Sequence, residues 1–327
     1  MVSNNVVHSQ KIERIIDQLN VILKQESTTH YGKRLNLFLA PVEDANTTKN
    51  NQRNECWRRK ICEWLFQVVD HCEFDRQVVF IALNYLDRTA SAAIKTEGHS
   101  IDEKKFQLLA TTCFYIAMKL HSTKDNSDLQ DLTADDMPQC KLRITEFVQL
   151  SRGLFAVAAL EEKEREILDM LDWHVNPPTA VLVITLLINF LPQNILPSKE
   201  LLNAKVEIYE VSRYLSELGV CVSSIAFNYT PSEIAYAAIL CAFEACVTKI
   251  HIPLDMRLQF TNNISASITC CHLTPDSVSS LKDLLKGLSP SMFVYEDDGL
   301  CEARFINNKS PEEGKGSPVC VTKHPNC

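Results

Sequence analysis

The sequence is poor in features that mark several large classes of protein. Only 8 of its 327 residues are glycine, which disfavours β-rich folds that depend on many tight turns. Acidic residues outnumber basic ones by 41 to 33, and the formal net charge is −8. Because nucleic-acid binding relies on a basic surface, this balance argues against a nucleic-acid partner.

Long apolar runs are also missing. The longest apolar stretch, residues 179–191, falls short of the ~20 residues that a membrane-spanning helix needs, and it contains Asn189. The first residues, MVSNNVVHSQKIERII, lack the apolar core of a signal peptide. We therefore expect a soluble chain that is not secreted and has no membrane partner.

Motifs that carry catalysis or bind metals are absent as well. The sequence has no HExxH, P-loop, GxGxxG or GxSxG motif. It has 13 cysteines and 9 histidines, but no CxxC pair and no spacing typical of a zinc site. The cysteines lie within apolar helical patterns, which predicts reduced thiols in the core. We expect no enzymatic activity, no cofactor and no metal.

Helical periodicity dominates what the sequence does contain. Apolar residues recur at i, i+3, i+4 and i+7 from Ile12 to Leu23, which predicts an amphipathic N-terminal helix. Segments 78–88 and 106–120 are apolar on nearly every side, as is typical of helices buried by their neighbours. The polar segment 25–54, in contrast, is predicted to be an irregular lead-in.

A proline stop, Asn176-Pro177-Pro178, divides the helical pattern into two groups of about five helices. The first group ends with helices predicted at 144–150 and 160–173. The second is predicted at 179–191, 198–218, 231–246, 254–268 and 275–288. The sequence therefore predicts an all-α protein with four parts. They are a helix and lead-in at 1–53, helical domains at 54–176 and 177–288, and a disordered tail at 289–327.

Several motifs, in order along the chain, resemble those of a cyclin box. The family places an Arg six residues before a Trp in the first helix and closes the second helix with N-Y-(I/L)-D-R. Arg58, Trp64 and residues 84–88 match these features. Three later segments, FQLLATTCFYIAMKL, ITEFVQLSRGLF and EKEREILDMLDWHVNPPT, are similar to the third, fourth and fifth helices of the box. Residues 215–239 resemble the second repeat, so the resemblance implies two tandem five-helix cyclin-box domains.

The resemblance also implies a partner, a cyclin-dependent protein kinase bound as a heterodimer. In the family, a Lys that ends the third helix and a Glu in the fifth contact the kinase, and these fall on Lys119 and Glu164. An apolar pocket beside them accepts an aliphatic side chain from a kinase helix. The matching positions are Ile116, Leu120, Leu168 and Val175, with Trp173 close by.

A second implied feature is a shallow hydrophobic patch on the first helix, which in several cyclins docks substrates and inhibitors through an Arg-x-Leu motif. Its positions are Trp57, Lys60, Ile61, Trp64 and Gln67, with Phe106 and Gln107 nearby. Here Lys60 replaces the usual Ile, and Gln67 replaces an acidic residue. Both changes disfavour an Arg-bearing motif. Inward packing of Ile61 and Trp64 is the alternative interpretation.

The resemblance implies a structural role for Arg58 and Asp87, as a buried ion pair that joins the first two helices. For the whole chain it predicts a non-catalytic cyclin, nearest the D-type or a divergent G1 class, that activates its kinase, helps control cell-cycle progression and resides in the nucleus or cytoplasm. The alternatives are a cyclin-fold transcription factor, a transcriptional cyclin, or a helical adaptor that has lost kinase binding. A transcription factor would need a basic face and usually a zinc ribbon, while the presence of both Lys119 and Glu164 argues against the adaptor.

Overall fold

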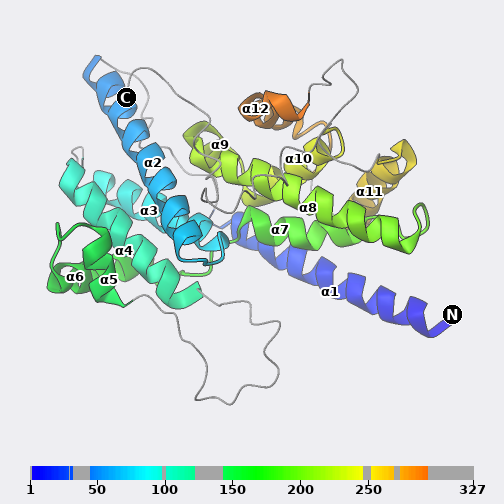
Figure 1. The fold of residues 1–327 in the computed structure, drawn as a ribbon, viewed down its shortest axis with the longest axis horizontal. Coiled ribbons are helices and arrows are strands. Elements are labelled where there is room, and N and C mark those ends of the chain that lie inside the picture. The colour runs from blue at the N-terminus through cyan, green and yellow to red at the C-terminus, as the bar shows by residue number, and fades with distance from the viewer. Residues whose placement is uncertain are drawn as a thin grey trace. The chain divides into compact units, whose positions relative to one another are not determined.

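The structure is a computed structural model that describes residues 2–28, 30–31, 45–97, 101–121, 143–245, 252–268 and 273–293. Every regular element within these ranges is an α-helix or a short 3₁₀ helix (Figure 1). The all-α class predicted from the periodicity is therefore confirmed. Among the helices described, none combines the length and the apolar composition needed to cross a bilayer.

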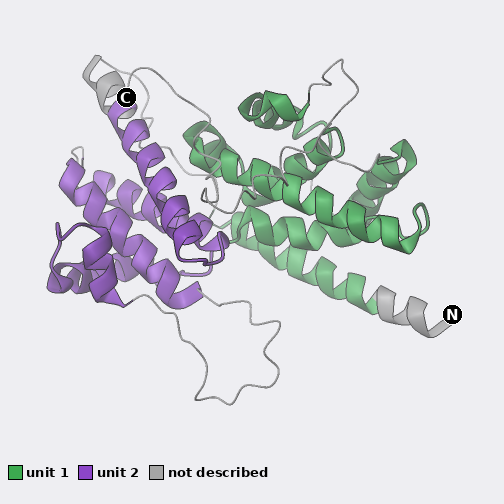
Figure 2. Ribbon diagram, in the orientation of Figure 1, with its two compact units in different colours: residues 1–34, 178–318 green, residues 35–177, 319–327 purple. Residues whose placement is uncertain are grey.

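The chain divides into two compact units (Figure 2). Unit 1 comprises Met1–Arg34 and Pro178–Pro318, and unit 2 comprises Leu35–Pro177 and Val319–Cys327. The division in the middle of the chain falls between Pro177 and Pro178, within the proline stop. The N-terminal helix therefore belongs to the same unit as the second group of helices.

Unit 2 is built around a central helix. Its helices are α2 (Ala45–His71), α3 (Gln77–Glu97), α4 (Glu103–His121), α5 (Ile144–Leu150) and α6 (Val157–Met170). Helix α3 packs against α2, α4 and α6. Phe114 of α4 lies at the centre of an aromatic cluster, edge-on to Trp64 at 5.7 Å and to Phe147 at 5.5 Å between ring centroids. This cluster joins α4 to α2 and α5, and α4 also packs directly against α6.

Two helix boundaries on either side of the predicted lead-in differ from those predicted. Helix α2 begins at Ala45, so the lead-in predicted for 25–54 is shorter than expected, and α1 itself continues to Glu26. The first turns of α2 are polar and carry no apolar stripe, so periodicity has nothing to detect there. These first turns form because extending the packed part of α2 costs less free energy than nucleating a new helix. The polar residues 122–142, which follow His121 at the end of α4, lie outside the described residues.

Unit 1 surrounds a helix that is buried almost throughout. Its elements are α1 (Val2–Glu26), α7 (Ala180–Leu187), the 3₁₀ helix η2 (Ile188–Phe190), α8 (Ser198–Cys221), α9 (Ser223–Asn228), α10 (Pro231–Ala242), α11 (Leu254–Ser267), α12 (Ser279–Leu288) and the 3₁₀ helix η3 (Pro290–Met292). Every residue of α10 after Pro231 is buried, and α7, α8 and α12 pack around it. Helix α1 contacts α7 and buries Ile15, Leu19 and Ile22.

The end of unit 1 corrects the predicted start of the tail. Residues 289–293 are ordered, and Met292 in η3 is only 1% exposed. Its apolar side chain keeps the chain packed beside α12 for one more turn. The rest of the predicted tail, from residue 294, lies outside the described residues. Helix α12 also starts four residues later than predicted, and α9 was not predicted at all.

A close approach between α8 and α12 depends on Gly219. A Cβ atom at this position would lie 3.2 Å from Cδ2 of the buried Leu285. Alanine improves helix propensity by about 1 kcal/mol, but overpacking a filled core costs about 1–3 kcal/mol. We therefore expect Gly219→Ala to lower the free energy of unfolding by about 1 kcal/mol in urea denaturation. Gly287→Ala, which meets no atom within 4 Å, is the control and should stabilise. Equal stabilisation by both would contradict this packing argument.

Candidate functional site

The fold brings a lysine and a glutamate together on the surface of unit 2. Lys119 lies in the last turn of α4 and Glu164 near the middle of α6. Lys119 Nζ donates a hydrogen bond to Glu164 Oε1 at 2.9 Å, and their side chains are 51% and 15% exposed. This hydrogen bond raises the pKa of Lys119, whose ammonium also lies 5.5 Å from the centroid of the Tyr115 ring. The result is a fixed, charged donor and acceptor at an accessible position, which we call the polar pair.

Apolar side chains border the polar pair, but not all those predicted are accessible. Leu120 is 49% exposed, and Leu168, one turn after Glu164, is half-buried. Ile116 is only 1% exposed and so belongs to the core beneath this surface. Val175 is half-buried, whereas Trp173 is 67% exposed. The apolar surface that a partner can reach beside the pair therefore comes mainly from Leu120, Leu168 and Trp173.

Helix α6 ends earlier than predicted, in a strained turn. The periodicity predicts a helix to Trp173, but α6 ends at Met170 and the chain turns through Leu171–His174, which we call the exit turn. Asp172 and Trp173 have φ values of 51° and 56°. Two successive residues other than glycine in the left-handed region are uncommon. The backbone N–H groups of Asp172 and Trp173 donate to the carbonyl oxygens of Asp169 and Leu168, as in a Schellman helix end, and contacts from elsewhere in unit 2 add to these bonds.

Side chains from α3 and α4 supply those contacts. Arg88 donates to the carbonyl oxygens of Leu171 at 2.9 Å and His174 at 2.6 Å, one on each side of the strained residues. Just beyond the turn, the carbonyl oxygen of Val175 accepts from the Tyr85 hydroxyl and, at 2.9 Å, from His121 Nε2. These donors hold the chain beyond α6, whereas the carbonyl oxygens in the last turn of the helix accept the backbone N–H groups of Leu171, Asp172 and Trp173.

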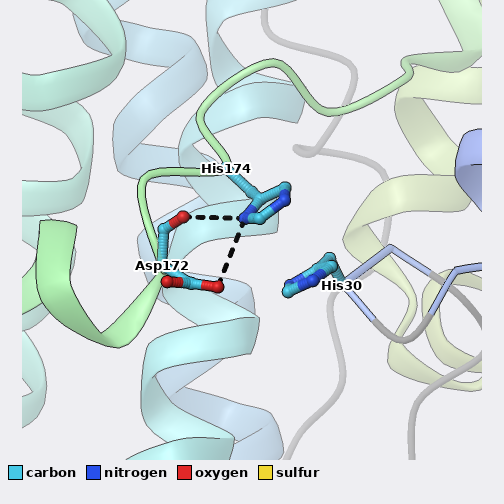
Figure 3. Close-up of side chains that lie close together, drawn as sticks. All are labelled: His30, Asp172 and His174. Atoms are coloured by element: carbon cyan, nitrogen blue, oxygen red, sulfur yellow. Dashed lines mark hydrogen bonds and ion pairs between the residues drawn. The ribbon is translucent and has the colours of Figure 1, made fainter.

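A local bond within the turn adds to this arrangement. His174 Nδ1 donates to the backbone oxygen of Asp172 at 2.7 Å and lies 3.9 Å from the Asp172 carboxylate, as the dashed lines of Figure 3 show. The bond to a carbonyl requires a proton on Nδ1 and fixes the orientation of the ring. His174 thereby contacts Asp172, on the other side of Trp173 in the sequence, which helps to hold the turn.

Sequence reasoning missed Tyr85, Arg88 and His121 as parts of this site. Tyr85 and Arg88 belong to the Asn84–Arg88 motif, which signalled the family but not what its members contact. Arg88 reaches a carbonyl 86 residues ahead in the chain. No periodicity carries information over that distance, so only the motif itself could have drawn attention to these residues.

The predicted docking patch on α2 is part core and part surface. Trp57, Ile61 and Trp64 are half-buried, while Lys60 and Gln67 are exposed. The Trp57 ring lies 5.8 Å from that of Phe106, which is itself buried, and Trp64 packs on Phe114. Gln107 is half-buried on α4, and the guanidinium of Arg53 lies 4.8 Å from the Trp57 ring centroid. The patch thus presents aromatic edges beside cationic groups.

Arg58 and Asp87 form a bidentate ion pair between α2 and α3. Arg58 Nε donates to Asp87 Oδ1 and Nη2 to Oδ2, both at 2.9 Å. The side chains are 1% and 7% exposed. Burial alone lowers the pKa of Arg58, but the Asp87 carboxylate more than offsets this and the net pKa lies above its ordinary value. The pair fixes the helices that carry the site and presents nothing to a partner.

Comparison with known proteins bears on the family of the chain. Residues 30–176 match the family described as cyclin, N-terminal domain. The chain is 29% identical to the G1/S-specific cyclin CLN2 of Candida albicans over 63% of its own length and 40% of that protein. It is 23% identical to Cyclin-A1-2 of Oryza sativa subsp. japonica, over 76% of this chain and 43% of that one. It is 25% identical to Cyclin-G1 of Pongo abelii, over 71% and 69%.

Among solved structures, a viral cyclin from herpesvirus saimiri is similar at 17% identity and a TM-score of 0.49, over 71% of this chain and 85% of that one. Over residues 30–176 the chain is similar to the N-terminal domain of cyclins, and the relatives that it matches are named as cyclins. It spans about two fifths of the first curated relatives that it matches, 40% and 43% of their lengths.

Proposed function

We propose that this chain is a cyclin, a non-catalytic regulatory subunit that binds a cyclin-dependent protein kinase through unit 2 and activates it. The observation that carries the proposal is the polar pair, Lys119 and Glu164, held at 2.9 Å on an accessible surface. Leu120 beside it is 49% exposed. Apolar side chains ringed by polar groups are the usual anatomy of a binding hot spot.

The proposed mechanism is a shift in the kinase's conformational equilibrium. A protein kinase needs its Lys–Glu ion pair and its magnesium-binding Asp in place before phosphoryl transfer. A cyclin that binds the active arrangement more tightly than the inactive one increases the population of the active form. In this chain Lys119 offers the remaining ammonium protons to the kinase, and Glu164 offers its second carboxylate oxygen. Both hydrogen-bond to backbone groups of the kinase's mobile helix.

Further parts of the proposal concern the cell. We place the chain in cell-cycle control, in the nucleus or cytoplasm, nearest the G1 cyclins. The patch on α2 is a second proposed contact, for substrates or inhibitors of the kinase. Exposed Lys60 and neutral Gln67 favour ligands without an arginine at that position, because like charges repel across an interface.

The proposal is tested by capture from a panel of cyclin-dependent kinases of the same organism, with affinity and kinase activity measured on each complex. Lys119→Glu and Glu164→Ala should each weaken binding at least about 30-fold, because truncating a buried interfacial charge costs about 2–5 kcal/mol. Lys104→Glu and Glu161→Ala are matched controls, since they alter exposed charges on the same two helices. Both controls should bind as the wild type does.

The outcomes distinguish an error in the proposed interface from an error in the proposed function. One kinase that binds, gains activity and loses both with either substitution at the pair would support the proposal. Binding that survives both substitutions would mean that the interface lies elsewhere. A folded wild type that captures no kinase would exclude the activator and favour the adaptor.

A further inference from the structure

Helix α8 of unit 1 presents two aliphatic side chains to solvent. One side of the helix packs against α7, α10 and α12. Leu202 and Val206 lie elsewhere on its surface, and they are 62% and 55% exposed. Because they stand at i and i+4, they are neighbours on one helix face and form a continuous apolar strip. Apolar area that remains in contact with water is available for burial against a partner.

A lysine on the same turn lacks the counter-ion that its burial calls for. Lys205 is half-buried, yet the ion pairs of α8 in the described part of the chain all belong to Arg213, which binds Glu210 and Glu217. Burial lowers the pKa of Lys205, and the charge of Lys11 on α1 lowers it further. A carboxylate in contact with Lys205 would raise this pKa. Two lysines of unit 1 therefore lie near each other without an acidic group between them among the described residues.

The acidic residues near these lysines in sequence are not placed to pair with them. Glu207 and Glu210 follow Lys205 by two and five positions, and Glu13 follows Lys11 by two. Side chains on a helix pair across three or four positions, so none of these carboxylates is a helix neighbour of the lysine. The free chain therefore contains a half-buried charge that is repelled by a like charge. A carboxylate from outside, placed between the two ammonium groups, would offset both effects through charge-assisted hydrogen bonds.

We propose that Lys11, Leu202, Lys205 and Val206 form a docking surface, the α8 face, for an acidic segment of a partner protein. A glutamate or aspartate of that segment binds the two ammonium groups, and aliphatic side chains beside it cover Leu202 and Val206. Charge complementarity selects this occupant, because a chain with a formal net charge of −8 repels acidic partners except where cations gather without acids. The α8 face lies on unit 1 and the proposed kinase contact on unit 2, so this inference goes beyond the proposed function.

The first test locates the binding of a defined acidic peptide. The probe is a short helical peptide of glutamate and leucine, acetylated and amidated so that its only carboxylates are side chains. A carbodiimide joins these carboxylates to the lysine amines that they contact, and mass spectrometry identifies the lysines. The yield at each lysine is divided by the yield obtained with acetate, which corrects for the reactivity of the amine. Lys205 and Lys11 should exceed the exposed Lys24 of α1 at least about tenfold.

The second test compares the affinity of the same peptide for variants of the full chain. Lys205→Glu should weaken binding at least about tenfold, because an attractive contact becomes a repulsive one. The new carboxylate also attracts Lys11, so the variant should fold at least as stably as the wild type. Lys24→Glu alters an exposed charge about 20 Å from Lys11 along α1 and is the matched control. Its affinity should equal that of the wild type.

A glutamine version of the peptide separates charge from apolar contact. Leu202→Ser should weaken the binding of both peptides, since either one covers the apolar strip. Lys205→Met keeps an apolar stem but removes the charge, so it should weaken only the glutamate peptide. A substitution that merely damaged unit 1 would weaken both peptides, and that result in Lys205→Met would overturn the role of the charge.

Three further outcomes would overturn the proposal. Cross-links at Lys205 no more frequent than at Lys24 would mean that the peptide has no preference for the α8 face. Equal affinity in the wild type and Lys205→Glu would remove the ion pair on which the proposal depends. A wild-type dimer in sedimentation that Lys205→Glu abolishes would make a second copy of this chain the occupant. Kinase capture by Lys205→Glu should match the wild type, so failure of the proposed function would leave the peptide results unchanged.

Discussion

Replacing Asp87 with alanine will lower the free energy of unfolding of unit 2 by about 3–5 kcal/mol, because it strands the buried guanidinium of Arg58 without its partner. The Arg58 side chain is 1% exposed, and both of its bonds to Asp87 are 2.9 Å long. Small domains are stable by only about 5–15 kcal/mol, so this single change removes a large part of the total.

The measurement is urea denaturation followed by tryptophan fluorescence. The tryptophans, at 57, 64 and 173, all belong to unit 2, so the signal reports that unit. Lys163→Ala breaks a surface pair with Glu166 and is the matched control, for which we expect a loss below about 1 kcal/mol. The double variant Arg58→Met with Asp87→Leu should recover most of the loss, because it leaves no unpaired charge. A loss in Asp87→Ala no greater than in the control would contradict this account.

The fold could be predicted from the sequence wherever a helix has an apolar face. The stripe from Ile12 to Leu23 gave α1, and the apolar segment at 78–88 gave the middle of α3. Periodicity failed where the cause is not local. It missed the polar first turns of α2, and it extended α6 to Trp173, although α6 ends at Met170 and Arg88 of α3 holds the carbonyl oxygens of Leu171 and His174 beyond it. Backbone groups that are satisfied by distant side chains leave no period behind.

The candidate site was predictable only through the family resemblance. No spacing rule pairs Lys119 with Glu164, which lie 45 positions apart, and the structure gives their geometry. Exposure was not predictable either. Ile116, Lys119 and Leu120 share a helical face by spacing, yet Ile116 is 1% exposed and Leu120 is 49% exposed. A residue's accessibility at a helix end depends on where the neighbouring helix stops, and that is tertiary information.

Glu26, at the end of α1, makes a tertiary contact with a residue far away in the sequence. Its side chain accepts hydrogen bonds from the backbone N–H of Ser232 at 2.9 Å and from the Ser232 hydroxyl at 2.6 Å. Ser232 lies in the first turn of α10, where backbone N–H groups lack partners within the helix. The carboxylate of one helix therefore caps another that is 206 positions away in sequence. This contact attaches α1 to the core of unit 1.

Because of Glu26, the free energy of unfolding of unit 1 will fall as the pH rises from about 4.5 to about 7. Burial raises the pKa of Glu26 from 4.5 to about 7, and the nearby Glu233 adds to the rise although the bonds from Ser232 oppose it. The folded state then holds a proton that the unfolded state has released, so stability is greatest below the lower pKa and falls until the upper one is passed. At about 1.4 kcal/mol per pH unit, the loss is roughly 3 kcal/mol.

The Glu26→Gln variant isolates this effect, because glutamine keeps an oxygen for the Ser232 N–H and an amide for its hydroxyl but does not titrate. Amide hydrogen exchange of α10, compared between variant and wild type at each pH, cancels the intrinsic pH dependence of exchange. The wild type should match or exceed the variant near pH 5 and lose protection relative to it by pH 8. Glu13→Gln, an exposed position on the same helix, should follow the wild type throughout. Parallel curves for wild type and Glu26→Gln would mean that the carboxyl ionises as freely in the folded chain as in the unfolded one, and that α1 is held by its apolar stripe alone.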